Sequence, residues 1–163
     1  MVDFEKLKRF SADIRIWTIR TIAEADFGHI GGSASIADVL AVLYGDVMQV
    51  RPEDPAWEGR DWLVLSKGHC APALYATLAL KGFFPMDWLK TLNRGGPRLP
   101  SHADRLRVPG IDMSTGSLGQ GISNAAGICW ANRLLGRDVW TYCIVGDGEC
   151  EEGQVWEACI AAA

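Results

Sequence analysis

Cys143-Ile144-Val145-Gly146-Asp147-Gly148-Glu149 is the stretch that decides the fold, because an apolar strand ends there on one carboxylate between two glycines. In open α/β sheets, ligands bind at the carboxyl ends of the strands. The two glycines let the backbone approach a ligand, but the bare carboxylate of Asp147 would repel a phosphate. A divalent cation such as Mg²⁺ between the two groups removes that conflict. The alternative interpretation is a plain turn, since Asp and Gly are both good turn formers.

A second glycine-rich stretch, Ser114-Thr115-Gly116-Ser117-Leu118-Gly119-Gln120-Gly121, stands directly before a helical pattern. Free backbone N–H groups and the positive end of the helix dipole make such a start an anion site, and small residues clear the way to it. The glycine spacing is G-x-x-G-x-G, which differs from the dinucleotide fingerprint G-x-G-x-x-G. A simple helix cap remains the alternative.

The three histidines, His29, His69 and His102, fall in breaks rich in Gly or Pro rather than on helix faces. His69 directly follows a predicted strand and the others occupy neighbouring breaks, so together they favour one shared site on a rim. Taken singly, each is also compatible with an ordinary surface or core histidine. Metal ligation is disfavoured because no pair of them has helical or hairpin spacing.

The rest of the chain alternates between strand and helix signals. Short apolar runs at 62–65 and 139–145 have the length of buried strands. Apolar periodicity and stop signals predict helices at 3–26, 35–47, 71–81, 118–133 and from Gln154 onward. The segments 51–60 and 93–113 read as loops, the second of a length that usually signals function. This alternation predicts an α/β fold with a parallel sheet flanked by helices.

Length and charge narrow the class of protein. The chain has 163 residues, 48% of them hydrophobic, which suits one domain with a single core. Sixteen basic and twenty acidic residues give a net charge of −4, and the basic residues are not clustered, so no nucleic-acid partner is expected.

The charged N-terminal residues, which do not resemble a signal peptide, and the cysteine usage favour a cytoplasmic location. Residues 1–10 are charged and lack the apolar core of a signal peptide. We expect that no window reaches the roughly 18 apolar residues that a membrane span requires, and therefore that the chain has no such span. The five cysteines are an odd set without a C-x-x-C pair, which suits free thiols in a reducing compartment better than disulfides or zinc.

Four motifs, in this order and spacing, resemble those of transketolases: GHIGGSASIADVLAVLY from Gly28, LSKGH from Leu65, STGSLGQG from Ser114 and GDGECEEGQVWEA from Gly146. The resemblance covers nearly the whole chain and points to the N-terminal subunit of the split, two-gene kind. It implies a thiamine diphosphate-binding fold, of which residues 1–163 form a single, partial domain that is incomplete at its C-terminus.

The resemblance also implies a function. A transketolase transfers a two-carbon ketol unit from a ketose phosphate to an aldose phosphate with thiamine diphosphate and Mg²⁺. By the family pattern Asp147 ligates Mg²⁺, and the cofactor is contacted by His69, Gly116, Ser117, Leu118 and Gly148. His29 and His102 would hydrogen-bond the hydroxyls of the donor sugar and shuttle protons, with His69 at the same catalytic centre. Glu152 matches an acidic position that the family uses at a dimer interface.

Some positions depart from the pattern of many single-chain transketolases. Ile30 and Ser117 replace prolines, which points to the split kind, and Ser101 replaces a glycine before His102. The family's second protein ligand for the metal is an Asn about thirty residues beyond Asp147, whereas only sixteen residues follow Asp147 here.

The pyrimidine-binding domain, which carries the glutamate that activates the cofactor, would come from a C-terminal partner subunit. We therefore expect residues 1–163 alone to be inactive, to bind the cofactor weakly or not at all, and to aggregate or melt at low temperature. Homodimers or heterotetramers are expected as the working assembly.

Three other interpretations stay open. The chain could serve another thiamine enzyme, of the deoxyxylulose-phosphate synthase or dihydroxyacetone synthase type. It could also be a non-catalytic module that pairs with a thiamine enzyme. A generic nucleotide-binding domain is disfavoured, because no acidic residue follows a Gly-rich turn at the ribose-binding distance.

Overall fold

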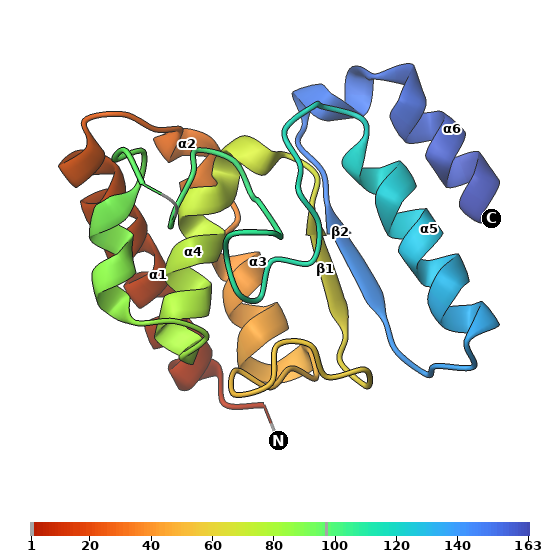
Figure 1. Cartoon of the computed structure of the whole chain (residues 1–163), viewed down its shortest axis with the longest axis horizontal. Helices are drawn as coiled ribbons and strands as arrows, with labels where there is room; N and C mark the ends of the chain where they lie inside the picture. The colour runs from red at the N-terminus through yellow and green to blue at the C-terminus, as the bar shows by residue number, and fades with distance from the viewer. Residues whose placement is uncertain (1, 97) are drawn as a thin grey trace.

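The computed structural model describes residues 2–96 and 98–163, so that Met1 and Pro97 lie outside the described residues. Two short parallel strands, β1 (Trp62–Leu65) and β2 (Thr141–Ile144), stand at the centre, with Trp62 opposite Thr141 and Leu65 opposite Ile144. Helices α1 to α4 lie on one side of the strands and α5 and α6 on the other (Figure 1). This arrangement confirms the predicted α/β fold with a parallel sheet flanked by helices.

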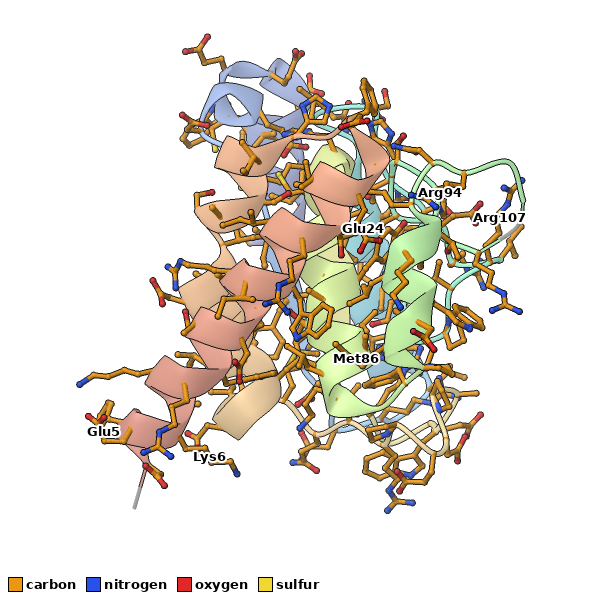
Figure 2. The ribbon with its side chains drawn as sticks, turned by 90° about the vertical axis from the view of Figure 1, so that its left-hand side faces the viewer. Glu5, Lys6, Glu24, Met86, Arg94 and Arg107 are labelled. Atoms are coloured by element: carbon orange, nitrogen blue, oxygen red, sulfur yellow. The ribbon has the colours of Figure 1, made fainter. Side chains whose placement is uncertain are left out.

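Helix α1 (Phe4–Ala25) forms as the apolar spacing predicts. The carboxylate of Asp3 accepts a hydrogen bond from the N–H of Lys6 at 3.0 Å and caps the first turn. The inner face packs against α3 and α4, and the helix ends where Asp26 adopts a left-handed conformation with φ 53°. Figure 2 shows Arg94 reaching the end of this helix, where its guanidinium donates to the carbonyl of Glu24 at 3.0 Å.

The helix predicted over 35–47 starts earlier and is divided into three pieces. These are α2 (Ile30–Ala34), α3 (Ala37–Val42) and a π-helical turn η1 (Leu43–Val47). At η1 the chain passes very close to α1, because a Cβ added at Gly45 would lie 2.7 Å from Cδ2 of Leu7. The prediction missed the earlier helix start at Ile30 because Gly31 and Gly32 read as a loop.

The same run corrects the expectation that no window is long and apolar enough for a membrane span. The 18 residues Ile30–Val47 reach a mean hydropathy of 1.3, which meets that criterion by length and composition. Leu40, Ala41 and Tyr44 from this run are buried in the core of the chain. Since core helices pass the same test, the hydropathy of this run is accounted for in part by its packing inside the molecule.

Helix α4 (Ala71–Lys81) is the central helix, with every residue from Ala71 to Ala79 buried. It follows a 3-10 turn, η2 (Gly68–Cys70), and ends at Gly82 with φ 90°, the left-handed conformation expected of a glycine stop. Another 3-10 segment, η3 (Met86–Thr91), leads from α4 toward the long loop.

The segment 93–113 is irregular, as predicted, apart from Pro97, which is not described. Buried contacts anchor it. The carboxylate of Asp112 accepts from the guanidinium of Arg60 at 2.7 Å and from the N–H of Leu63 at 2.8 Å. The hydroxyl of Tyr75 donates to the carbonyl of His102 at 2.9 Å. The loop is therefore tied both to the start of β1 and to α4.

The last third of the chain supplies the second side of the sheet. Helix α5 (Gly121–Leu134) starts three residues later than predicted, and β2 covers only the middle of the run 139–145. A 3-10 turn, η4 (Gly148–Glu151), precedes α6 (Gly153–Ala162). Within the described residues β2 pairs with β1 alone, and apolar side chains nearby are exposed at Trp130, Leu134, Trp140, Trp156 and Ile160.

Candidate functional site

A cleft of about 660 Å³ lies at the carboxyl ends of β1 and β2. Four segments that are far apart in sequence line it: α2 with Gly32, the end of β1 with Lys67 and His69, the turn before α5 with Leu118, and the end of β2 with Asp147. A second hollow of about 570 Å³ lies against α1, far from these motifs. The cleft at the strand ends is therefore where the sequence motifs meet.

The end of β2 presents Asp147 to solvent. Asp147 and Gly148 are exposed, whereas Gly146 and Glu149 are buried. The carboxylate of Glu149 turns back and accepts a hydrogen bond from the N–H of Gly146 at 2.9 Å, which closes the loop around Asp147. Sequence reasoning assigned no role to Glu149. No local pattern marks it, because burial of a carboxylate requires donors, and here two of them come from distant segments.

The turn before α5 packs tightly against the end of β1. A Cβ added at Gly121 would lie 2.6 Å from Cα of Ser66, and one added at Gly68 would lie 2.6 Å from the carbonyl carbon of Thr115. The hydroxyl of Thr115 also donates to the carbonyl of Leu65 at 2.6 Å. Side chains at either glycine would force the two segments apart, so these glycines are needed for close approach rather than for flexibility.

The structure divides the three residues of this turn that were predicted to contact a cofactor. Leu118 lines the cleft, while Gly116 and Ser117 line a separate hollow of about 200 Å³. Gly116 has φ 149°, and a Cβ there would lie 2.9 Å from Cδ2 of His102. Gly116 thus makes room for that imidazole in addition to any ligand.

The three histidines lie close to one another. His69 lines the cleft, and the ring of His29 packs against it with centroids 4.9 Å apart. Burial of the imidazole lowers the pKa of His69, and the charges of His29, Lys67 and His102 lower it further. His29 and His102 are exposed, whereas His69 is half-buried. The structure therefore brings His29 and His69 into contact, whereas His102 lies against Gly116, and a site shared by all three histidines stays a prediction.

Lys67 is a site residue to which sequence reasoning assigned no role. Its side chain is only 7% exposed, and its ammonium donates to the carbonyl of Gly32 at 3.2 Å and to the hydroxyl of Ser35 at 3.3 Å. Lysine is rarely buried without a carboxylate partner, so no signal in the sequence indicated a burial that depends on Gly32 and Ser35. It brings a positive charge to the same cleft as Asp147.

The cysteines do not form disulfides in the structure, and all five are free. Cys70 is buried beside the cleft, and burial raises the pKa of its thiol. Burial likewise raises the pKa of Cys143, on β2, to about 12. Both thiols are therefore protonated near neutral pH, which makes them poor nucleophiles.

Comparison with known proteins agrees with this geometry. Residues 7–163 match the family model described as transketolase, thiamine diphosphate binding domain. The chain is 54% identical over 149 residues to a 6-deoxy-6-sulfo-D-fructose transketolase subunit of Clostridium sp. (strain MSTE9), covering 91% of this chain and 54% of that protein. It is 41% identical over 157 residues to an apulose-4-phosphate transketolase subunit of Phocaeicola vulgatus, covering 96% and 56%. The chain thus spans about half the length of these relatives.

The fold is also that of solved transketolases. A transketolase from Leishmania mexicana superposes with a TM-score of 0.90 at 34% identity, over 97% of this chain and 25% of that one. A transketolase from Campylobacter jejuni gives a TM-score of 0.86 at 33% identity, over 97% and 26%. With its motifs gathered at one cleft, its fold and its sequence in agreement, the chain belongs to the transketolase family as an N-terminal, thiamine diphosphate-binding portion of it.

Proposed function

We propose that this chain is the N-terminal portion of a transketolase that transfers a two-carbon ketol unit from a ketose phosphate to an aldose phosphate with thiamine diphosphate and Mg²⁺. The observation that carries the proposal is the cleft in which Asp147, between two glycines, faces the same space as His69 and Lys67. When bound, thiamine diphosphate supplies the nucleophilic carbon of the ketol transfer, and the protein binds and orients it.

The residues of the cleft fit a diphosphate with a cation. Gly31 and Gly148 line it, and a Cβ added at either would meet no atom within 4 Å, so the backbone there is open to a ligand. Among the described residues no group of three or more His, Cys, Asp or Glu could hold a metal ion. The exposed carboxylate of Asp147 beside this open backbone suits an Mg²⁺ ion that binds Asp147 and diphosphate oxygens.

The proposed roles follow from these positions. Asp147 ligates the metal, Gly148 lets the backbone approach the diphosphate, and Leu118 with His69 contacts the cofactor. His69 has a lowered pKa and is uncharged at neutral pH, so it can lie against a cation-bearing ring without repulsion.

The two exposed histidines complete the rim. We assign His29 and His102 to hydrogen bonds with the donor's hydroxyl groups and to proton transfer, work for which enzymes most often use imidazole side chains. Gly116 and Ser117 line the separate hollow, where Gly116 leaves room for the ring of His102. Their contact with the cofactor stays a prediction.

A partner subunit is part of the proposal. Relatives that carry the word subunit in their names are about twice as long as this chain, and they support a partner that contributes the pyrimidine-binding domain. Glu152 is exposed next to the turn before α5, since a Cβ at Gly119 would lie 3.1 Å from its Cβ. We propose that the region of Glu152 contacts the partner within a homodimer or heterotetramer.

The substrate class can be tested with the same assembly. The relatives are named for 6-deoxy-6-sulfo-D-fructose and for apulose-4-phosphate, which supports a ketose with a terminal anionic group as donor. Turnover with fructose 6-phosphate or 6-deoxy-6-sulfofructose and an aldose phosphate acceptor would support a transketolase. Turnover of pyruvate would instead favour the deoxyxylulose-phosphate synthase type, and formaldehyde as acceptor the dihydroxyacetone synthase type.

Cofactor binding is the first experiment. Calorimetric titration of the chain in its natural polypeptide, assembled with the partner, is expected to show thiamine diphosphate binding that requires Mg²⁺. Asp147→Ala is expected to abolish binding, while Asp138→Ala, which removes an exposed carboxylate elsewhere, leaves it unchanged. Equal, metal-independent binding by Asp147→Ala would refute the assignment, and no binding by the unmodified protein would favour a non-catalytic module.

A further inference from the structure

A single buried carboxylate ties together the segments that form the cleft. Glu149 is 2% exposed. One of its oxygens, Oε1, accepts from the hydroxyl of Ser66 at 2.5 Å and from the N–H of Gly119 at 2.9 Å. The other, Oε2, accepts from the N–H of Gly146 at 2.9 Å. The three donors come from the end of β1, the turn before α5 and the end of β2, which are 83, 30 and 3 residues away in sequence.

Each donor stands next to a residue of the cleft. Gly119 follows Leu118, and Gly146 precedes Asp147. Ser66 precedes Lys67 and stands three residues before His69. A shift of Glu149 would therefore move the metal ligand, the hydrophobic wall and the basic wall of the cleft relative to one another.

The chemistry of these bonds requires a carboxylate. An ionised carboxylate only accepts, and both of its oxygens are used here. A Gln side chain of the same size would have to point its NH₂ group at the N–H of Gly146 or at the N–H of Gly119. A backbone N–H cannot accept, so one buried donor would lose its partner and would be left desolvated without compensation.

We propose that Glu149 is a positioning residue for the cofactor, which sets the affinity for thiamine diphosphate and Mg²⁺ by holding Asp147, Leu118 and His69 at fixed separations. Glu149 would act through the segments that it holds, because both of its carboxylate oxygens are engaged by protein donors. Groups that orient a metal ligand commonly change metal affinity by about 10–100-fold when they are replaced. This inference rests on the proposed function, because it concerns the affinity of that same cleft for that cofactor.

The test uses the chain in its natural polypeptide, assembled with the partner subunit. Three variants are compared with the unmodified protein: Glu149→Gln, Ser66→Ala and Glu151→Gln. The last is the matched control, because it makes the same charge change two residues away at an exposed side chain. The readouts are the Kd for thiamine diphosphate in excess Mg²⁺ by calorimetry, the Mg²⁺ requirement at fixed thiamine diphosphate, and thermal melting without cofactor.

Glu149→Gln is expected to raise the Kd at least about tenfold, at a temperature where the melt shows that the variant is folded. Ser66→Ala removes one donor and leaves two, so we expect a rise of about two- to fivefold. Glu151→Gln should stay within about twofold of the unmodified protein, because water already solvates its carboxylate.

A merely structural role has a different signature. It would lower the melting temperature of Glu149→Gln without cofactor and leave the Kd of the folded variant unchanged, which would overturn the inference. If Glu149→Gln does not fold, the Kd of Ser66→Ala decides, and a value equal to that of the unmodified protein overturns it. Absence of binding by the unmodified protein would instead refute the proposed function, and this inference with it.

Discussion

The imidazole rings of His29 and His69 meet edge to face, with centroids 4.9 Å apart and planes at 66°. His29 precedes α2 and His69 belongs to η2, so the two rings come from elements that are far apart in sequence. Two imidazoles at this separation resist being charged together, and the charge of His29 adds to burial in lowering the pKa of His69. The pair therefore presents at least one neutral ring near pH 7.

Removal of an exposed histidine is expected to affect turnover rather than folding. In the assembled enzyme, His29→Ala or His102→Ala should reduce kcat by about 10²-fold or more, as loss of a proton-transfer group does. Both side chains are exposed, so the melting temperature without cofactor should change little. Steady-state kinetics and thermal melts measure the two quantities. Unmodified rates in both variants would show that these histidines are ordinary surface residues.

The lowered pKa of His69 predicts a pH dependence of stability. As the pH falls through about 6.5, the unfolded chain takes up a proton at this position before the folded chain does. The free energy of unfolding that His69 contributes is therefore fully present above about pH 6.5 and is lost below it. Urea unfolding at about pH 7.5 and about pH 5.5, on either side of that value, should show a smaller loss of stability for His69→Asn than for the unmodified protein. An equal or larger loss in the variant would contradict this sign.

Among the ion pairs of the described residues, the one between Arg60 and Asp112 is expected to cost the most unfolding free energy when it is broken. Their side chains are 14% and 9% exposed, and Asp112 also accepts from the N–H of Leu63. Asp112→Ala leaves a buried guanidinium without its carboxylate partner, which should cost about 3–5 kcal/mol of unfolding free energy. Chemical unfolding measures this cost.

The exposed pair between Lys90 and Asp87 provides the control for that experiment. Asp87→Asn should leave the melting temperature unchanged within error, because water already solvates both groups. A comparable loss of stability in the two variants would mean that the position of Asp112 in the long loop is less constrained than its contacts indicate.

Two glycines of helix α5 should respond to alanine in opposite directions. A Cβ at Gly121 would lie 2.6 Å from Cα of Ser66, so Gly121→Ala must separate α5 from the end of β1, at a cost of about 1–3 kcal/mol. Gly127 lies in the same helix with nothing within 4 Å of an added Cβ, so Gly127→Ala should stabilise the protein by about 0.5–1 kcal/mol.

Thermal melting of both variants tests this contrast. Because Gly121 lies beside the segment that carries Ser66, Gly121→Ala should also weaken thiamine diphosphate binding, whereas Gly127→Ala should not. Equal effects of the two substitutions would mean that the close approach at Gly121 is relaxed at little cost.

Much of the fold could be predicted from the sequence because local signals agreed with one another. The apolar runs that became β1 and β2, the periodicity of α1 and the glycine that ends α4 each depend on neighbours along the chain. The motif around Asp147 also identified the strand end at which the cleft lies, because ligands in open α/β sheets bind at the carboxyl ends of the strands.

The tertiary structure alone decided what depends on contacts between distant segments. No local pattern shows that Glu149 is buried under donors from three segments, or that Lys67 is buried beside the carbonyl of Gly32. The division of 30–47 into three helical pieces accompanies the close passage of Gly45 against Leu7, which a periodicity cannot show. Sequence determines which residues are available, but burial and hydrogen-bond partners arise only when the chain closes on itself, and these set the charge and position of each side chain in the cleft.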